Sequence, residues 1–238
     1  MNDTRDPSIV KARPIKNISL RKIVFMPMDL HFPKFTRLFS EHGFNSHKTP
    51  QGRLLLKGRM GIHLGCIGAP AAVLALEPLI LSGAGSIMIL GFCGALSDRC
   101  KIGDAVLITQ AISDEGTSRH YISKKKWFSS SRVLVQESEI LLNTQNLPYA
   151  KGSLVSTDAP YRETPDWLEK FQKLGAECVD MEASAVFALA SFYGIEAAAL
   201  MIVSDELWAG CWKSGFRTPE LEKSAEKYFL PFLEREGS

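Results

Sequence analysis

Residues 180–205 read DMEASAVFALASFYGIEAAALMIVSD, and this stretch decides the fold class. Its first half has helix-forming composition over 183–193, and Gly194 fits the left-handed residue that often ends a helix. Residues 197–203 form a continuous apolar run, which is typical of a strand buried on both faces of a parallel sheet. Asp205 follows this strand, and open α/β sheets bind ligands at that end of their strands. We therefore predict an α/β fold with a binding site at this edge.

The rest of the chain alternates strands with helices. Short apolar runs predict strands at 22–28, 61–67, 86–90, 104–112, 152–156 and 177–180. Helices are predicted at 30–42, 68–81, 165–174 and 220–234. Pro78 and Pro231 are expected to end or kink the second and the last of these helices. The glycines of 91–94 are expected to end a strand, and 114–132 is expected to be a polar loop.

Composition favours one soluble domain with a single core. The chain has 238 residues, 45% of them hydrophobic, and a net charge of +2, which does not suggest nucleic acid as the main partner. We predict one doubly wound α/β domain over 22–238, preceded by a flexible arm at 1–21. Five cysteines without a C-x-x-C pair indicate reduced thiols in a cytoplasmic protein. No segment is long and apolar enough to cross a membrane.

Four blocks, in this order, resemble the nucleoside phosphorylase family, which includes purine nucleoside and uridine phosphorylases and the methylthioadenosine/adenosylhomocysteine nucleosidases. The blocks are GCIGAP at 65–70, GFCGAL with IGD at 91–104, DEGTSRHY at 114–121, and DMEAS with VSD at 180–205. The resemblance implies a single-domain phosphorylase-like fold, with a mixed, twisted central sheet flanked by helices. It implies no metal and no organic cofactor.

The resemblance assigns the sugar to Met181 and Glu182. Met181 would pack on the ribose face, and Glu182 would accept hydrogen bonds from the ribose hydroxyls. An ionised carboxylate suits this role because it only accepts, and its two oxygens match a vicinal diol. The alternative is that Glu182 is a first-turn acid favoured by the helix dipole.

The same resemblance assigns the base. Asp205 would be the general acid that protonates the leaving purine, which requires a carboxyl group of raised pKa. Arg217 would support this acid; the alternatives are an N-cap role for Asp205 and a plain surface position for Arg217. Tyr161 would stack on the base and Arg162 would bond its exocyclic oxygens, with Ser204 beside them.

The pattern departs from the phosphorylases where phosphate should bind. The first strand should end in Gly-Asp-Pro followed by an arginine, and here 28–33 reads MDLHFP. An arginine and a threonine expected around the glycine at 91 are replaced by Ile89 and Phe92, next to Cys93. Backbone N–H groups at Gly68 could still bind an anion. A phosphate dianion needs charge-assisted donors, so this position is predicted to be apolar.

These departures favour water as the acceptor over phosphate. The family's hydrolases carry an acidic segment at the end of the first strand, and we hypothesise that Asp29 or His31 takes the proton of the water here. His31 is alternatively a loop residue or a contact to a sugar hydroxyl. A phosphorylase with a rebuilt anion site, for example through Arg119, and a non-catalytic nucleoside-binding protein are the other hypotheses. The expected partner is a small-molecule nucleoside, with a purine base favoured, and the resemblance implies a homo-oligomer, a dimer or hexamer.

Overall fold

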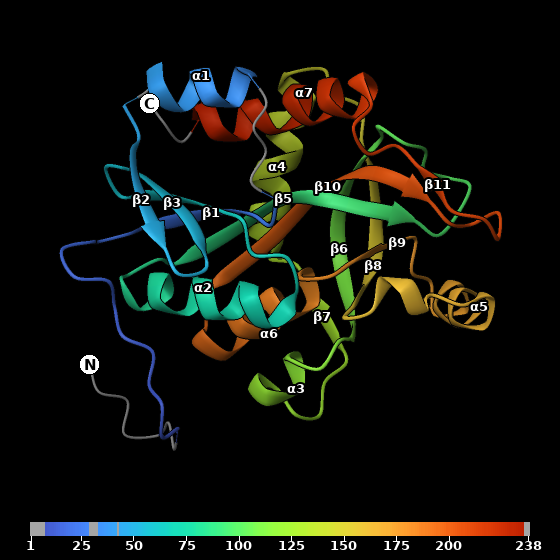
Figure 1. The fold of residues 1–238 in the computed structure, drawn as a ribbon, viewed down its shortest axis with the longest axis horizontal. Helices are drawn as coiled ribbons and strands as arrows, with labels where there is room; N and C mark the ends of the chain where they lie inside the picture. Colours follow the sequence, from blue (N-terminus) through green and yellow to red (C-terminus); the bar gives the residue numbers. More distant parts are fainter. Residues whose placement is uncertain (1–7, 29–32, 42, 236–238) are drawn as a thin grey trace.

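The computed structural model describes residues 8–28, 33–41 and 43–235 (Figure 1). Within these residues, eleven strands form one mixed sheet in the order β11-β10-β6-β8-β9-β5-β1-β4-β3-β2, with β7 paired to β6. The strands are β1 (Lys22–Met26), β2 (Asn45–Thr49), β3 (Gly52–Lys57), β4 (Met60–Leu64), β5 (Ser86–Ala95), β6 (Ala105–Asp114), β7 (Trp127–Ser129), β8 (Ala150–Thr157), β9 (Cys178–Asp180), β10 (Glu196–Glu206) and β11 (Lys213–Ser214). The helices are α1 (Pro33–Glu41), α2 (Ala69–Leu81), α3 (Ser118–Tyr121), α4 (Arg132–Thr144), α5 (Pro165–Lys173), α6 (Ala183–Tyr193), α7 (Pro219–Arg235) and the 3₁₀ turn η1 (Pro160–Arg162).

The sheet closes on itself because β10 pairs with both β5 and β6. The strands β10, β6, β8, β9 and β5 therefore form a ring, and β1, β4, β3 and β2 extend from it as an open sheet. The predicted α/β class and mixed central sheet are confirmed. The closure was not predicted, because an antiparallel pair such as β10–β6 leaves no local signal in a fully apolar strand.

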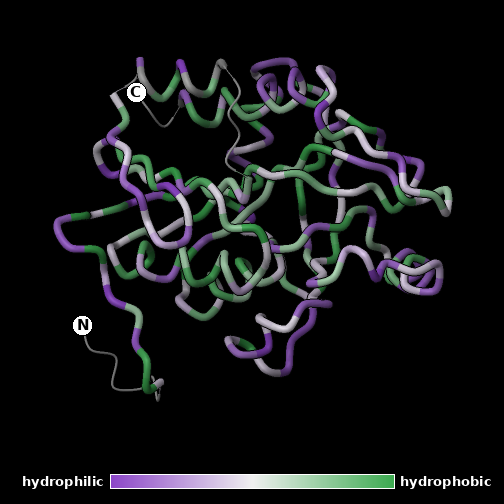
Figure 2. The backbone as a smooth tube through the Cα atoms, in the orientation of Figure 1, coloured by the Kyte–Doolittle hydropathy of each residue, from purple (hydrophilic) through white to green (hydrophobic). Residues whose placement is uncertain are grey.

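Helices cover both faces of the sheet, as Figure 1 shows. α2 and α6 pack on one face, where the alternate side chains of β5 include Ile87 and Ile89. α1, α4 and α7 pack on the other face, which includes Met88 and Leu90. Figure 2 shows apolar residues following the central strands. Each face buries its own apolar cluster, so the strands between them are apolar without alternation.

Pro78 and Pro231 are expected to end or kink their helices, and neither of them ends its helix. α2 continues through Pro78 to Leu81, and α7 continues through Pro231 to Arg235. A proline leaves the carbonyl four residues earlier without its helical hydrogen bond. In α2 that carbonyl belongs to Leu74, whose side chain is 58% exposed, and water can satisfy it.

The glycines at 91–94 do not end β5, which runs on to Ala95. A Cβ on Gly91 would lie 3.1 Å from Sδ of Met201, and one on Gly94 would lie 3.2 Å from a carboxylate oxygen of Asp205. These glycines allow close approach of neighbouring strands rather than a turn. The segment predicted as a polar loop at 114–132 contains α3 and β7. The β2–β3 hairpin and α4 had no prediction.

Before β1, the chain already touches the core. Ile15 and Ile18 pack against the α2–α6 side, and Leu20 is buried. The flexibility of the arm at 1–21 remains a prediction. Among the described residues, no helix combines the length and the apolar composition that a membrane crossing requires.

Candidate active site

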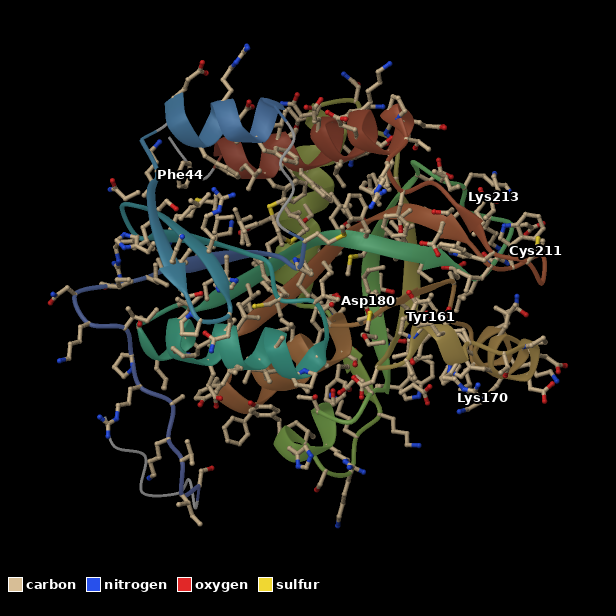
Figure 3. All side chains as sticks on the ribbon, viewed as in Figure 1. Phe44, Tyr161, Lys170, Asp180, Cys211 and Lys213 are labelled. Carbon is tan, nitrogen blue, oxygen red and sulfur yellow. The ribbon has the colours of Figure 1, made fainter. Side chains whose placement is uncertain are left out.

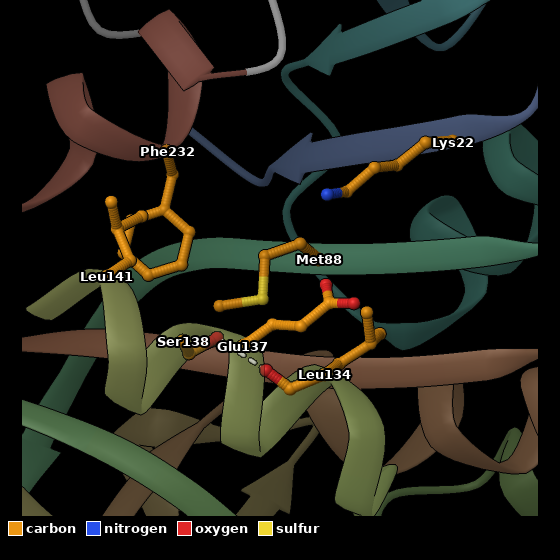
Figure 4. A pocket seen from close by; sticks show the side chains of 7 residues that line it. All are labelled: Lys22, Met88, Leu134, Glu137, Ser138, Leu141 and Phe232. Atoms are coloured by element: carbon orange, nitrogen blue, oxygen red, sulfur yellow. Dashed lines mark hydrogen bonds between the residues drawn. The ribbon is translucent and has the colours of Figure 1, made fainter.

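A cavity of about 520 Å³ opens at the carboxyl ends of β5, β9 and β10, a volume in the usual range for small-molecule sites. Its lining is apolar and acidic: Pro27, Met28, Ile67, Leu90, Gly91, Phe92, Cys93, Gly94, Pro160, Tyr161, Glu163, Val179, Asp180, Met181, Glu182, Ser204, Asp205, Leu207, Trp212 and Phe216. A second cavity, of about 20 Å³, lies between β5, α4 and α7, and Figure 4 shows the side chains that line it. That space is too small for an organic ligand, so the larger cavity is the candidate site.

The turn between β9 and α6 supplies two buried carboxyl groups. Oδ2 of Asp180 accepts the backbone N–H of Ala183 at 2.8 Å, and Oδ1 accepts the hydroxyl of Ser156 at 2.5 Å. Asp180 therefore satisfies the first N–H of α6, whose N-cap residue is Glu182. Glu182 turns away from the helix, and its Oε1 accepts the N–H of Gly68 at 2.6 Å. The side chain of Glu182 makes no capping hydrogen bond to α6, whereas Asp180 accepts the N–H of its first residue.

Burial sets the charge of this pair. Burial, and after it the charge of the nearby Asp180, raise the pKa of Glu182 to about 8, against the hydrogen bond from Gly68. Burial likewise raises the pKa of Asp180 to about 6. At neutral pH Glu182 can therefore both donate and accept a hydrogen bond, which also matches a sugar diol.

A third buried carboxylate, Glu115, ties the loop after β6 to α6. It accepts the hydroxyls of Ser113 at 2.6 Å and Ser184 at 2.9 Å, and the backbone N–H groups of Thr117 at 2.5 Å and Ser118 at 2.9 Å. Burial alone would raise the pKa of Glu115, but these hydrogen bonds hold it below its ordinary value. The network fixes the helix that carries Glu182.

A β-bulge aims Asp205 into the cavity. The register of β10 against β5 shifts between Val203 and Asp205, and both Ser204 and Asp205 line the cavity. Regular alternation would place these neighbours on opposite faces. The strand continues to Glu206 and pairs with β11, so Asp205 lies within it and is no N-cap.

Asp205 is held by an indole and a hydroxyl. Its Oδ1 accepts the hydroxyl of Ser204 at 2.7 Å, and its Oδ2 accepts Nε1–H of Trp212 at 2.8 Å. The predicted partner Arg217 is exposed, does not line the cavity, and has no described bond to Asp205. Arg217 sits in a turn at φ 65° beyond β11, whereas Trp212 precedes that strand. In this structure Trp212, and not Arg217, bonds Asp205, and the role of Arg217 remains a prediction.

Replacing Gly215 by alanine should disturb this support. The N–H of Gly215 bonds the carbonyl of Ser204 at 2.8 Å, and an added Cβ would lie 2.7 Å from that oxygen. Because a backbone atom cannot yield as a side chain can, β11 must shift, at a cost of about 1–3 kcal/mol. Denaturant unfolding of Gly215→Ala measures the loss. Gly210→Ala is the control: no atom lies within 4 Å of its added Cβ, and its cost reflects the backbone φ of 71° alone. Equal stability of Gly215→Ala and wild type would contradict the close approach.

Of the residues predicted to contact the base, Tyr161 and Ser204 line the cavity and Arg162 does not. Tyr161 is fully exposed and lies at the cavity mouth, near Asp180 in Figure 3, while Cys211 and Lys213 mark the outer turn between β10 and β11. Arg162 is exposed and does not line the cavity. The base roles of Tyr161 and Ser204 remain predictions, and the structure does not bring Arg162 to the site.

The predicted phosphate position is altered in the structure as well. Phe92 and Cys93 line the cavity, and Phe92 packs edge-on against Phe216. Ile89 is fully buried in the cluster on the α2–α6 side and is not one of the residues that line the cavity. The N–H of Gly68 is already bonded to Glu182. Among the described lining residues there is no lysine, arginine or histidine.

Two of the predicted residues lie outside the described part of the chain, and some of the residues that line the cavity were not predicted. Asp29 and His31, the hypothetical water-activating groups, lie outside the described residues. Glu163 and Trp212 line the cavity without having been predicted. Neither belongs to the four motif blocks, and a single acid or tryptophan in a turn carries no periodic signal, so only the fold brings them to the site.

Comparison with known proteins agrees with the motif blocks. Residues 23–232 match the family model described as the Phosphorylase superfamily. This chain belongs to that superfamily. A curated member, guanosine phosphorylase from Halorubrum lacusprofundi, is 32% identical over 160 residues, which cover 67% of this chain and 66% of that protein. This superfamily member thus spans just under two thirds of the length of the relative it matches.

Solved structures of superfamily members share the fold. Uridine phosphorylase from Vibrio fischeri ES114 matches with a TM-score of 0.76 at 24% identity, covering 93% of both chains. The 5′-methylthioadenosine/S-adenosylhomocysteine nucleosidase from Helicobacter pylori matches with a TM-score of 0.70 at 19% identity, covering 91% of this chain and 99% of that one. The predicted family and fold are confirmed.

Proposed function

We propose that this superfamily member cleaves the N-glycosidic bond of a nucleoside, with a purine favoured as the base. The proposal is supported above all by one cavity lined by both Glu182 and Asp205, the two acids that the motif blocks assign to the sugar and to the base. Family membership supports the reaction class. Because the matched relative is only partly covered, its activity enters here as a proposal for this chain.

The sugar end of the proposed site is the β9–α6 turn. Glu182 would bond the ribose hydroxyls with the oxygen that Gly68 does not use, and Met181 would pack on the ring. The base would extend toward Asp205 with Tyr161 at the mouth, where aromatic rings can stack on it. A purine is further supported by the curated relative, which is a guanosine phosphorylase.

Two acceptors are proposed, each on its own observation. Phosphate is favoured by the curated relative, which is a phosphorylase, and this support is stronger than any that the comparisons offer for water. Water is favoured by the lining, because its described residues contribute carboxyl groups and no cation to balance a dianion. A homo-oligomer that adds a basic group from a second copy would reconcile the two, and the assembly remains a proposal.

A phosphate titration separates the acceptors. Purified protein is incubated with inosine, guanosine, adenosine and uridine at zero to millimolar phosphate, and sugar 1-phosphate and free sugar are quantified. If water is the acceptor, free sugar forms at a rate independent of phosphate. A saturating dependence with sugar 1-phosphate as the product would establish phosphorolysis and contradict water. Arg119→Ala, outside the cavity lining, then tests the rebuilt anion site, since it should lower the apparent phosphate affinity.

A further inference from the structure

The indole of Trp212 bonds the carboxyl group that the motif blocks assign to the base. Trp212 lies between Cys211 and Lys213, both labelled in Figure 3, at the end of the turn from β10 to β11. Its side chain is 67% exposed and lines the cavity, and its Nε1–H donates to Oδ2 of Asp205 at 2.8 Å. The ring therefore touches the proposed acid and is open to a ligand.

The turn that carries Trp212 is fixed where it leaves the sheet. The buried carboxylate of Glu206 accepts the backbone N–H of Ile102 at 3.2 Å and a hydrogen bond from Nζ of Lys213 at 3.1 Å. Glu206 and Lys213 also face each other in the pairing of β10 with β11. These bonds hold the backbone on both sides of the turn, so the position of Trp212 follows from the fold.

The indole makes the two oxygens of Asp205 unequal. An indole N–H can only donate, so the oxygen that it binds, Oδ2, is held as an acceptor. Oδ1 accepts the hydroxyl of Ser204 at 2.7 Å, but the same hydroxyl lies 3.2 Å from the carbonyl oxygen of Cys93. Because a hydroxyl can turn, and can accept as well as donate, Ser204 leaves Oδ1 free to carry a proton. A proton on Asp205 therefore belongs on Oδ1.

Trp212 supports this carboxyl group without adding a charge. A cation in the same place would favour the ionised form of the acid before the reaction begins. The indole N–H is neutral, and it can bond the carbonyl oxygen of a carboxylic acid as well as a carboxylate. Trp212 can thus stay in place while Asp205 gives up its proton, and the hydrogen bond becomes stronger as the negative charge forms.

We propose that Trp212 is the positioning residue for Asp205: it holds Oδ2, so that the proton rests on Oδ1 and moves from there to the departing base. This inference rests on the proposed nucleoside cleavage and deepens it, with Asp205 as the general acid. It applies equally to water and to phosphate as the acceptor.

The step conserves atoms and charge. The bond between the anomeric carbon and the base nitrogen breaks, and its electron pair stays on the base. The proton on Oδ1 moves to a ring nitrogen, which leaves a neutral base and an Asp205 carboxylate that Trp212 and Ser204 both bond, as in the structure. The acceptor, water or hydrogen phosphate, bonds the anomeric carbon and releases one proton, which equals the one that Asp205 regains through solvent.

A substrate that needs no protonation tests this role. The purine ring of 7-methylinosine already carries a positive charge, so its base leaves without an acid. We expect Trp212→Phe, which keeps an aromatic ring but has no N–H, to lower kcat/KM for inosine about tenfold or more, the size of one lost hydrogen bond to the carboxylate that forms. The same variant should cleave 7-methylinosine within about threefold of the wild-type rate.

Trp208→Phe is the matched control. Trp208 lies in the same turn but does not line the cavity, and its indole N–H bonds Glu206 at 3.2 Å. Glu206 keeps its bonds from Ile102 and Lys213 in this variant, so neither rate should change.

Nuclear magnetic resonance tests the contact itself without turnover. The four tryptophans of the chain give separate indole N–H resonances, and the peak that disappears in Trp212→Phe belongs to Trp212. Asp205→Asn should move this resonance upfield, because a hydrogen bond to a neutral amide is weaker than one to a carboxylate, and should leave that of Trp208 in place. A Trp212 resonance that does not respond to Asp205→Asn would contradict the contact.

Three kinetic results would overturn the inference. Equal losses with both substrates in Trp212→Phe would show that the ring serves binding or structure and not the acid. An unchanged inosine rate in Trp212→Phe, together with a selective loss in Arg217→Ala, would return the supporting role to Arg217. Wild type that cleaves neither nucleoside would overturn the proposed function and this inference together, which is a distinct result from the other two.

Discussion

Replacing Glu182 by alanine is expected to lower kcat/KM for a ribonucleoside by about 10²- to 10³-fold, because the two buried ribose hydroxyls would lose their hydrogen-bond partner. Glu182 is buried and lines the cavity, and one of its oxygens bonds Gly68. Its remaining oxygen is the acceptor proposed for the sugar hydroxyls. Initial rates of base release over a range of substrate concentrations measure the effect.

A comparison of a ribonucleoside with its 2′-deoxy analogue tests the assignment of Glu182 more sharply. Wild type should prefer inosine over 2′-deoxyinosine, because the deoxy sugar leaves a buried acid unpaired. Glu182→Ala should lose most of that preference. Glu196→Ala, an exposed acid at the start of β10, is the matched control and should behave as wild type. A Glu182→Ala variant that keeps the full preference for the ribose 2′-hydroxyl would contradict the assignment of the sugar to this residue.

The largest effect on stability is expected from Glu115→Ala, with a loss of about 3–4 kcal/mol in the free energy of unfolding. The substitution leaves two hydroxyls and two backbone N–H groups without their acceptor, and these groups join α3 to α6. Denaturant unfolding followed by circular dichroism measures it. Asp158→Ala is the control: among the described residues, this exposed carboxylate accepts one hydrogen bond, from the N–H of Gly116 at 2.8 Å, and its loss should cost under about 1 kcal/mol.

The Glu115 effect should depend on pH with a defined sign. The pKa of Glu115 is lowered in the folded protein, so its charged form stabilises the fold above the ordinary glutamate pKa of about 4.3. That contribution is lost as the pH falls through the lower folded value. The stability gap between wild type and Glu115→Gln should therefore shrink below about pH 4. A gap that stays constant from neutral to acid pH would contradict the charged network.

Local signals predicted the elements around the site. α6 begins at Ala183 and ends at Tyr193 as predicted, with Gly194 in the left-handed conformation. β10 is buried along nearly its whole length, as its apolar run indicated. Both depend on interactions within one segment and its immediate neighbours. The ring closure through β10 depends on pairing between distant strands, and the polar β2 strand has no apolar alternation to mark it.

Most of the predicted lining residues belong to the motif blocks, and Tyr161 is the one outside them. Glu182, Met181, Asp205, Ser204 and Tyr161 all line the cavity, although their roles remain proposals. Which other side chains reach the cavity depends on the surface turns after β10 and at η1. Their backbone conformations bring Trp212 and Glu163 inward and leave Arg217 and Arg162 outside, and no spacing rule applies to such turns.

Chromatographic measurement of free base released from inosine and guanosine tests the central claim most directly. The account predicts that wild-type protein releases hypoxanthine and guanine together with an equal amount of sugar product, and that Glu182→Ala does so about 10²-fold more slowly. Nucleosides left intact by the wild type, both with and without phosphate, would contradict the account.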